Sequence, residues 1–155
     1  MNNCVKVVIM GISGRMGQML FQAVEENSET VLIGAIEVKG HAWLGRDLGT
    51  ILSNKKNGII VSDDALRFIS KADAVIDFTT PLASVFYSRL TAQARIPHII
   101  GTTGFSDLDL KELSNASWHT PIIRAGNMSL GVNLLVELSK KISKALTDEF
   151  DVEIV

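Results

Sequence analysis

Three glycines near the N-terminus constrain the fold of this chain more than any other feature: Gly11, Gly14 and Gly17. They directly follow the apolar, mostly β-branched run Val5–Met10, which predicts a strand buried on both faces, as in a parallel sheet. Apolar residues then recur at helical spacing and predict a helix face made of Met16, Met19, Leu20, Ala23 and Val24. The chain is therefore expected to begin with a strand, a glycine turn and a helix.

The spacing of these glycines is typical of a phosphate-binding turn. The turn reads GxxGxxG, and its outer glycines keep the six-residue separation of the GxGxxG fingerprint. Glycine lets an anion approach the free N–H groups at the positive end of a helix, and Arg15 could add paired donors. The alternative to phosphate binding is that the glycines form an ordinary turn, which only packs the helix on the strand. Glu37 favours phosphate binding, because an acid about twenty residues after the turn binds the adenosine ribose hydroxyls.

Strand and helix patterns alternate along the rest of the chain. Strands are expected at Thr30–Ile36, Ile59–Val61, Ala74–Phe78, His98–Ile100 and Ile122–Ile123, with a closing strand from Asp151. A short helix is expected to end at Ile69, with Ser62 or Asp63 as its cap. Longer helices are expected over Leu82–Ala94, after the N-cap Thr80 and Pro81, and over Asp107–Asn115, after the N-cap Ser106. A last amphipathic helix is expected through Leu134, Leu135, Leu138 and Ile142. Residues 38–58 read mostly as loop.

This alternation predicts an α/β fold, a Rossmann-type doubly wound parallel sheet. We expect a dinucleotide-binding domain over residues 1–130. Residues 131–155 would begin a second α+β domain for substrate binding and oligomerisation, and the ending within a strand suggests a fragment of a longer protein.

Ligands of parallel sheets bind at the carboxyl ends of the strands. Three later loops are expected at this edge, after the strands Ala74–Phe78, His98–Ile100 and Ile122–Ile123. The small and polar residues of any one loop could equally serve only to form turns and helix caps. Together with the glycine turn, however, the three loops favour a nucleotide-binding site. The candidate cofactor-binding residues are Gly11, Ile12, Ser13, Gly14, Arg15, Met16, Glu37, Phe78, Thr79, Gly101, Thr102, Thr103, Ala125, Gly126, Asn127 and Met128.

Composition narrows the classes of partner. The 155 residues carry a net charge of −2, which gives no electrostatic reason to expect nucleic acid or a membrane surface. The lone cysteine, Cys4, fits a reducing cytoplasmic compartment. His41, His98 and His119 lack metal-ligand spacing, so no metal site is expected.

Several motifs, in this order, resemble dihydrodipicolinate reductase (4-hydroxy-tetrahydrodipicolinate reductase) of lysine and diaminopimelate biosynthesis. They are the GRMG tetrapeptide at 14–17, Glu37, Asp77-Phe78-Thr79, the GTTGF loop at 101–105, and Asn127–Asn133. The resemblance spans nearly the whole chain. It implies an oxidoreductase that transfers hydride from NADH or NADPH to a cyclic, unsaturated dicarboxylic imine, and a homotetramer at full length.

The resemblance also implies that the catalytic and substrate-binding residues lie outside this chain. Members of the family continue into a His-His segment, a lysine and a Ser-Gly-Thr loop, which supply the general acid and the substrate-carboxylate contacts; none occurs here. No catalytic residue is therefore expected in this chain, and the isolated fragment is expected to be inactive. Many members place an arginine after the acid to hold the NADP phosphate. Here Val38 and then Lys39 follow, which leaves the cofactor preference open.

Two alternatives remain from the sequence. One is another Rossmann dehydrogenase of the homoserine or aspartate-semialdehyde type, because an identical fold serves several reactions. The other is a non-catalytic nucleotide-binding module.

Overall fold

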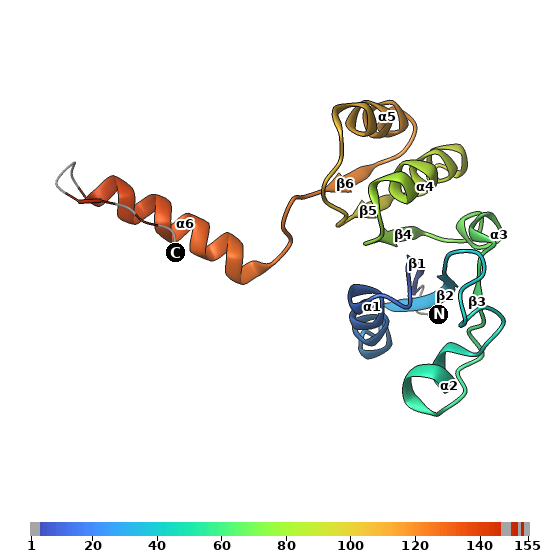
Figure 1. Cartoon of the computed structure of the whole chain (residues 1–155). Helices are drawn as coiled ribbons and strands as arrows, with labels where there is room; N and C mark the ends of the chain where they lie inside the picture. Colours follow the sequence, from blue (N-terminus) through green and yellow to red (C-terminus); the bar gives the residue numbers. More distant parts are fainter. Residues whose placement is uncertain (1–3, 147–149, 152, 154–155) are drawn as a thin grey trace. The chain divides into compact units, whose positions relative to one another are not determined.

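The computed structural model describes residues 4–146, 150, 151 and 153 of the chain (Figure 1). They belong to two compact units, residues 1–124 and residues 125–155, which are treated separately below. No helix among these residues is both long enough and apolar enough to cross a bilayer.

The first unit is built on a six-stranded, entirely parallel sheet in the order β3-β2-β1-β4-β5-β6. This is the strand order of a doubly wound Rossmann sheet, so the predicted fold class is confirmed. The strands are β1 (Val5–Met10), β2 (Thr30–Ile36), β3 (Val61–Ser62), β4 (Ala74–Asp77), β5 (His98–Ile100) and β6 (Ile122–Arg124). The helices of this unit are α1 (Arg15–Glu26), α2 (Leu48–Ser53), α3 (Ala65–Ile69), α4 (Pro81–Ala94) and α5 (Asp107–Ser117).

Apolar residues cover both faces of the sheet, because alternate residues of the central strand point to opposite sides. Val7 and Ile9 of β1 belong to one core cluster, with Phe21 and Val24 of α1 and Leu48 of α2. The next residues along β1 belong to the opposite cluster. That cluster is formed by Val8, Met10, Ile36, Ala65, Ile69, Ala72 and Val75, with side chains of α3 and α4 packed against it. Two-sided burial explains why the strands read as continuous apolar runs.

The helix after the glycine turn buries only part of the predicted face. Val24 is buried and Leu20 packs against the core as predicted, whereas Met16 and Met19 are 41% and 61% exposed. The prediction missed two buried positions, Phe21 and Gly17. Gly17 packs on the glycine turn itself, where its missing side chain lets the helix come close.

The segment after β2 also departs from expectation. Residues 38–58, predicted as mostly loop, contain α2, whose N-terminus is capped by the Asp47 carboxylate accepting from the Thr50 N–H at 2.9 Å. The third strand is Val61–Ser62 rather than Ile59–Val61. The cap of α3 is Asp64, and not Ser62 or Asp63, with its carboxylate accepting from the Arg67 N–H.

The other helices follow their sequence signals. Thr80 caps α4 and Pro81 is its first residue, as predicted. Ser106 caps α5 in a reciprocal capping box with Asp109, and the helix ends at Ser117 rather than at Asn115.

The second unit contains one described helix, α6 (Leu130–Ala145), capped by Ser129. It includes the predicted residues Leu134, Leu135, Leu138 and Ile142. Most of the predicted closing strand, Asp151–Val155, lies outside the described residues, and the described Asp151 and Glu153 have no assigned secondary structure.

Candidate functional site

A cavity of about 620 Å³ opens at the carboxyl ends of β1, β2 and β4. This is the point where the strand order reverses between β1 and β4, and ligands of open α/β sheets bind at such switch points. The cleft is lined by Gly11, Ser13, Gly14, Glu37, Val38, Lys39, Asp63, Phe78, Thr79, Thr80, Ala83 and Tyr87. Six of these are predicted cofactor-binding residues: Gly11, Ser13, Gly14, Glu37, Phe78 and Thr79.

The glycine turn presents the start of α1 to this cleft. Gly14 is the N-cap and provides no side-chain acceptor, and the N–H groups of Arg15 and Met16 have no acceptor among the residues that the structure describes. Free N–H groups at a helix N-terminus carry partial positive charge and favour phosphate. The residues present therefore fit a pyrophosphate group.

Two of the glycines are required by close contacts. A Cβ on Gly17 would lie 2.3 Å from the Gly11 carbonyl oxygen, so only glycine lets α1 pack this closely on the turn. Gly11 has φ +68°, and a Cβ there would lie 2.8 Å from the Thr79 methyl carbon. The turn is thus held between α1 and the loop after β4.

Glu37 follows β2 and is only 9% exposed. Its two carboxylate oxygens accept from the Ser13 N–H at 3.0 Å and from the Val38 N–H at 2.9 Å. Burial alone would raise the pKa of Glu37, but these hydrogen bonds outweigh it and lower the pKa below its ordinary value. The cleft therefore contains a fixed, ionised carboxylate at the place predicted for the ribose acid, with one expected bare amide, that of Ser13, already bonded to it.

The loop after β4 and the loop after β5 are packed against each other. A Cβ on Gly101 would lie only 2.0–2.4 Å from ring atoms of Phe78. The flat group that rests on the Gly101 backbone is therefore the Phe78 ring of the chain itself. Phe78 links this loop to the cleft that it also lines.

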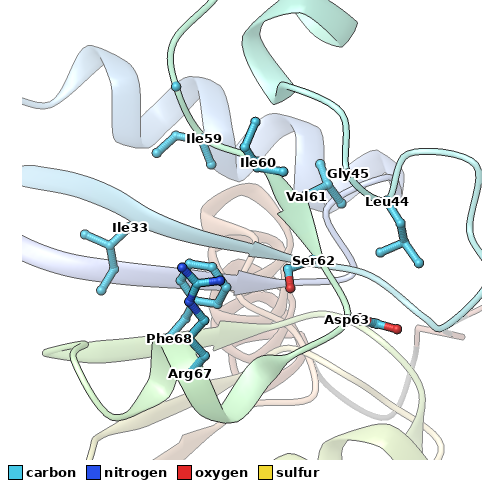
Figure 2. Close-up of a pocket in the computed structure, with 11 residues that line it drawn as sticks. Ile33, Leu44, Gly45, Ile59, Ile60, Val61, Ser62, Asp63, Arg67 and Phe68 are labelled. Atoms are coloured by element: carbon cyan, nitrogen blue, oxygen red, sulfur yellow. The ribbon is translucent and has the colours of Figure 1, made fainter.

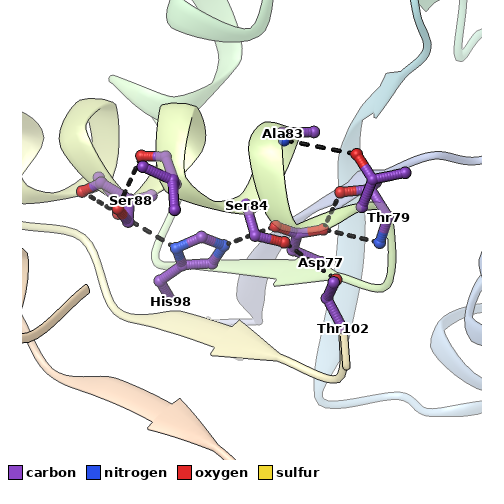
Figure 3. Close-up of polar contacts among 10 residues, drawn as sticks. Asp77, Thr79, Ala83, Ser84, Ser88, His98 and Thr102 are labelled. Carbon is purple, nitrogen blue, oxygen red and sulfur yellow. Dashed lines mark hydrogen bonds and ion pairs between the residues drawn. The ribbon is translucent and has the colours of Figure 1, made fainter. Parts of the chain in front are cut away.

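Behind these loops lies a buried polar network that sequence reasoning missed (Figure 3). Asp77 and His98 are both 0% exposed, and Asp77 Oδ2 lies 3.3 Å from His98 Nε2. Burial would raise the pKa of Asp77, but its contacts with His98, Thr79 and Ser84 lower it overall. A signal was present in the sequence: Ser84, Ser88 and Thr91 recur at helical spacing and form a hydroxyl-bearing stripe on the buried face of α4.

The structure does not bring every predicted residue to the cleft. The Ile12 side chain is fully buried in the core, and its N–H donates to the Ile36 carbonyl, while the side chains of Arg15 and Met16 are exposed outside the residues that line the cavity. Thr102 is 5% exposed and its hydroxyl accepts from Ser84 at 2.9 Å. Thr103 is exposed.

The remaining candidates, Ala125, Gly126, Asn127 and Met128, belong to the second unit. Asn127 Oδ1 accepts from the Ser129 N–H at 2.8 Å, so its side chain forms a local turn before α6. The assignment of all four residues to cofactor binding stays a prediction.

A second cavity, of about 470 Å³, lies beside the edge strand β3 (Figure 2). Ile33, Arg67 and Phe68 border it together with residues 58–63. It contains no residue of the glycine turn and no acid other than Asp63, so the first cleft is the better fit for a dinucleotide. Within the described part of the chain, no group of three or more His, Cys, Asp or Glu side chains could hold a metal ion.

Comparison with known proteins agrees with this geometry. Residues 5–128 match the family model described as dihydrodipicolinate reductase, N-terminus. The chain is 49% identical over 149 residues to 4-hydroxy-tetrahydrodipicolinate reductase of Ruegeria pomeroyi, covering 96% of this chain and 55% of that protein. It is 48% identical to the protein of that name from Dinoroseobacter shibae, covering all of this chain and 58% of the relative.

A solved structure has the same fold. Dipicolinate-bound dihydrodipicolinate reductase from Paenisporosarcina sp. TG-14 superposes with a TM-score of 0.71 at 24% identity, covering 90% of this chain and 54% of that one. The chain thus spans a little over half the length of the relatives it matches. Because sequence matches of this extent single out one family among the dehydrogenases that share this sheet, the homoserine and semialdehyde alternatives are set aside. The chain belongs to the dihydrodipicolinate reductase family and corresponds to its N-terminal part.

Proposed function

We propose that this chain binds a nicotinamide dinucleotide in the cleft at the carboxyl ends of β1, β2 and β4. One observation carries the proposal: the glycine turn and the ionised Glu37 carboxylate line one cavity at the same sheet edge. The turn leads directly into the free N–H groups of Arg15 and Met16 at the start of α1. The amides suit the pyrophosphate and the carboxylate suits the ribose hydroxyls. The remaining predicted contacts, including Phe78 and Thr79, would line the path between them.

We propose further that the cleft prefers NADH to NADPH. Glu37 cannot turn away without losing two backbone hydrogen bonds, so a 2′-phosphate would meet a fixed negative charge. Lys39 lines the same cleft and offsets part of this repulsion. NADPH is therefore accepted more weakly.

The activity we propose for the whole protein is reduction of 4-hydroxy-tetrahydrodipicolinate to tetrahydrodipicolinate in lysine and diaminopimelate biosynthesis, within the cytoplasm. The names of the relatives and the dipicolinate bound by the solved relative, a cyclic dicarboxylate, support this reaction. The bound cofactor supplies hydride. This chain binds and orients it, and the exposed Thr103 is its best-placed residue to meet substrate. The family resemblance supports a homotetramer.

Calorimetric titration with NADH and NADPH tests the binding site. Glu37→Ala is expected to weaken NADH binding at least tenfold, because hydrogen bonds to a charged group contribute about 1.5–3 kcal/mol and tenfold corresponds to about 1.4 kcal/mol. Glu25→Ala is the matched control, since Glu25 is an exposed acid on α1 that does not line the cleft. Thermal melting of each variant separates lost binding from lost folding.

Binding of neither cofactor by the folded wild-type chain would refute the proposal. The 155-residue chain alone is expected to bind NADH without oxidising it in the presence of the cyclic substrate, because the proton donor of the family is not among its residues. Binding by a whole protein that never turns over substrate would instead support the non-catalytic module.

A further inference from the structure

The buried pair Asp77–His98 lies between the sheet and the hydroxyl stripe of α4 (Figure 3). Val75 pairs with His98 and Asp77 with Ile100, so the two side chains are diagonal neighbours on one face of the sheet. An ionisable pair in a core is costly unless each charge is matched, and removing one partner leaves an uncompensated charge. A buried ionisable pair of this kind calls for a reason beyond packing.

The pair is connected to the cleft through one residue. Asp77 Oδ1 accepts from the Thr79 N–H at 2.9 Å and from the Thr79 hydroxyl at 2.6 Å. Thr79 in turn lines the cleft, and its methyl group lies against Gly11 of the glycine turn. Asp77 therefore fixes both the backbone and the side chain of the residue that contacts the turn.

His98 holds the other oxygen of Asp77. His98 Nε2 lies at ion-pair distance from Asp77 Oδ2 but outside hydrogen-bond geometry, and neither atom has a hydrogen-bond partner among the described residues. The Thr91 hydroxyl donates its only hydrogen to the Ser88 carbonyl at 3.0 Å, so it faces His98 Nδ1, at 3.4 Å, with a lone pair. Both ring nitrogens of His98 therefore face oxygen atoms, one of Asp77 and one of Thr91.

We propose that His98 and Asp77 form a buried positioning pair that locks Thr79 against the glycine turn and thereby sets the affinity of the cleft for the dinucleotide. This proposal rests on the proposed dinucleotide binding. His98 touches no cofactor; it acts by orienting the Asp77 carboxylate, which orients Thr79.

Substitutions at His98 test the pair through NADH affinity. His98→Leu removes the partner of Asp77 and is expected to weaken NADH binding about tenfold. His98→Gln keeps a side-chain N–H within reach of Asp77 and is expected to stay within about threefold of wild type. Val85→Ala is the matched control for core damage, because the Val85 side chain is buried on α4 and takes no part in the polar contacts, to which this residue contributes only its backbone carbonyl.

A double-mutant cycle with Thr79→Val tests the route of the effect, because residues that act through one another give non-additive changes. If each single substitution weakens NADH binding about tenfold, the double variant is expected to lose little more than tenfold. A hundredfold loss would overturn the proposal, as would an unchanged affinity in folded His98→Leu or an equal loss in Val85→Ala.

One measurement without cofactor keeps this proposal separate from the proposed function. Hydrogen exchange of the Thr79 amide is expected to accelerate at least tenfold in His98→Leu and to stay unchanged in Val85→Ala. If His98→Leu does not fold, Asp77→Asn provides the same comparison. Unchanged Thr79 exchange in the variants would overturn the pair, whereas failure of wild type to bind NADH would overturn only the proposed function.

Discussion

Replacement of Gly17 by alanine is expected to disturb both the stability of the chain and its nucleotide site. The new Cβ would lie 2.3 Å from the Gly11 carbonyl oxygen and 2.8 Å from Ile12 Cα, and both neighbours are backbone atoms that no rotamer change can move. An ordinary contact begins near 3.4 Å, so α1 must retreat by 3.4 − 2.3 = 1.1 Å. Such overpacking lowers the free energy of unfolding by about 1–3 kcal/mol. The better helix propensity of alanine offsets up to about 1 kcal/mol of this loss.

The same retreat carries the N–H groups of Arg15 and Met16 away from the cleft, so NADH affinity should fall along with stability. Urea unfolding and calorimetric titration measure the two effects. Gly14→Ala is the matched control for stability, because its Cβ would lie 3.3 Å from the same oxygen at an unstrained φ of −67°. A Gly17→Ala variant with wild-type stability and wild-type NADH affinity would show that α1 does not pack on the turn as described.

Three further predictions concern charge, capping and cofactor preference. Burial would raise the pKa of Asp77, but the contacts with His98 and Thr79 outweigh it and leave the pKa below its ordinary 3.8. The stabilisation from this carboxylate is therefore present above that value and is lost as pH falls through the lower, folded pKa. Urea unfolding at pH 6 and pH 3 should show a smaller pH dependence in Asp77→Asn than in wild type, and equal dependence would contradict this. Ser106→Ala should lower the free energy of unfolding by about 0.5–2 kcal/mol, because the N-cap of α5 is lost, whereas Ser106→Asn should leave it nearly unchanged. An unchanged free energy of unfolding in Ser106→Ala would show that the capping box does not stabilise α5. Val38→Arg should raise the affinity for NADPH relative to NADH about tenfold by pairing a guanidinium with the 2′-phosphate, and an unchanged ratio in calorimetry would count against this placement of the ribose.

Much of the fold could be predicted because its determinants are local. Two-sided burial makes β1 and β2 continuous apolar runs, and caps at Thr80 and Ser106 mark the starts of α4 and α5. The short α2 escaped prediction because its cap, Asp47, resembles ordinary loop chemistry among nearby glycines. The buried face of α1 was predicted only in part, because the close contact at Gly17 has no side chain to mark it.

The candidate site was predictable where backbone geometry determines it. Glycine spacing and the position of Glu37 follow directly from strand length and the needs of an anion. The pairing of Asp77 with His98 could not be predicted in the same way, because it joins residues of two strands across the sheet. Only the register between β4 and β5 brings them together, and register is a property of the assembled sheet.

The bond between Glu37 and the Ser13 amide has a consequence for the kinetics of recognition. It ties the glycine turn to the second strand while no ligand is present, so the turn acquires its shape during folding. An arriving nucleotide then meets a rigid receptor and loses little conformational entropy on the protein side. Association should accordingly proceed in a single fast phase, without a slow rearrangement that follows the first encounter.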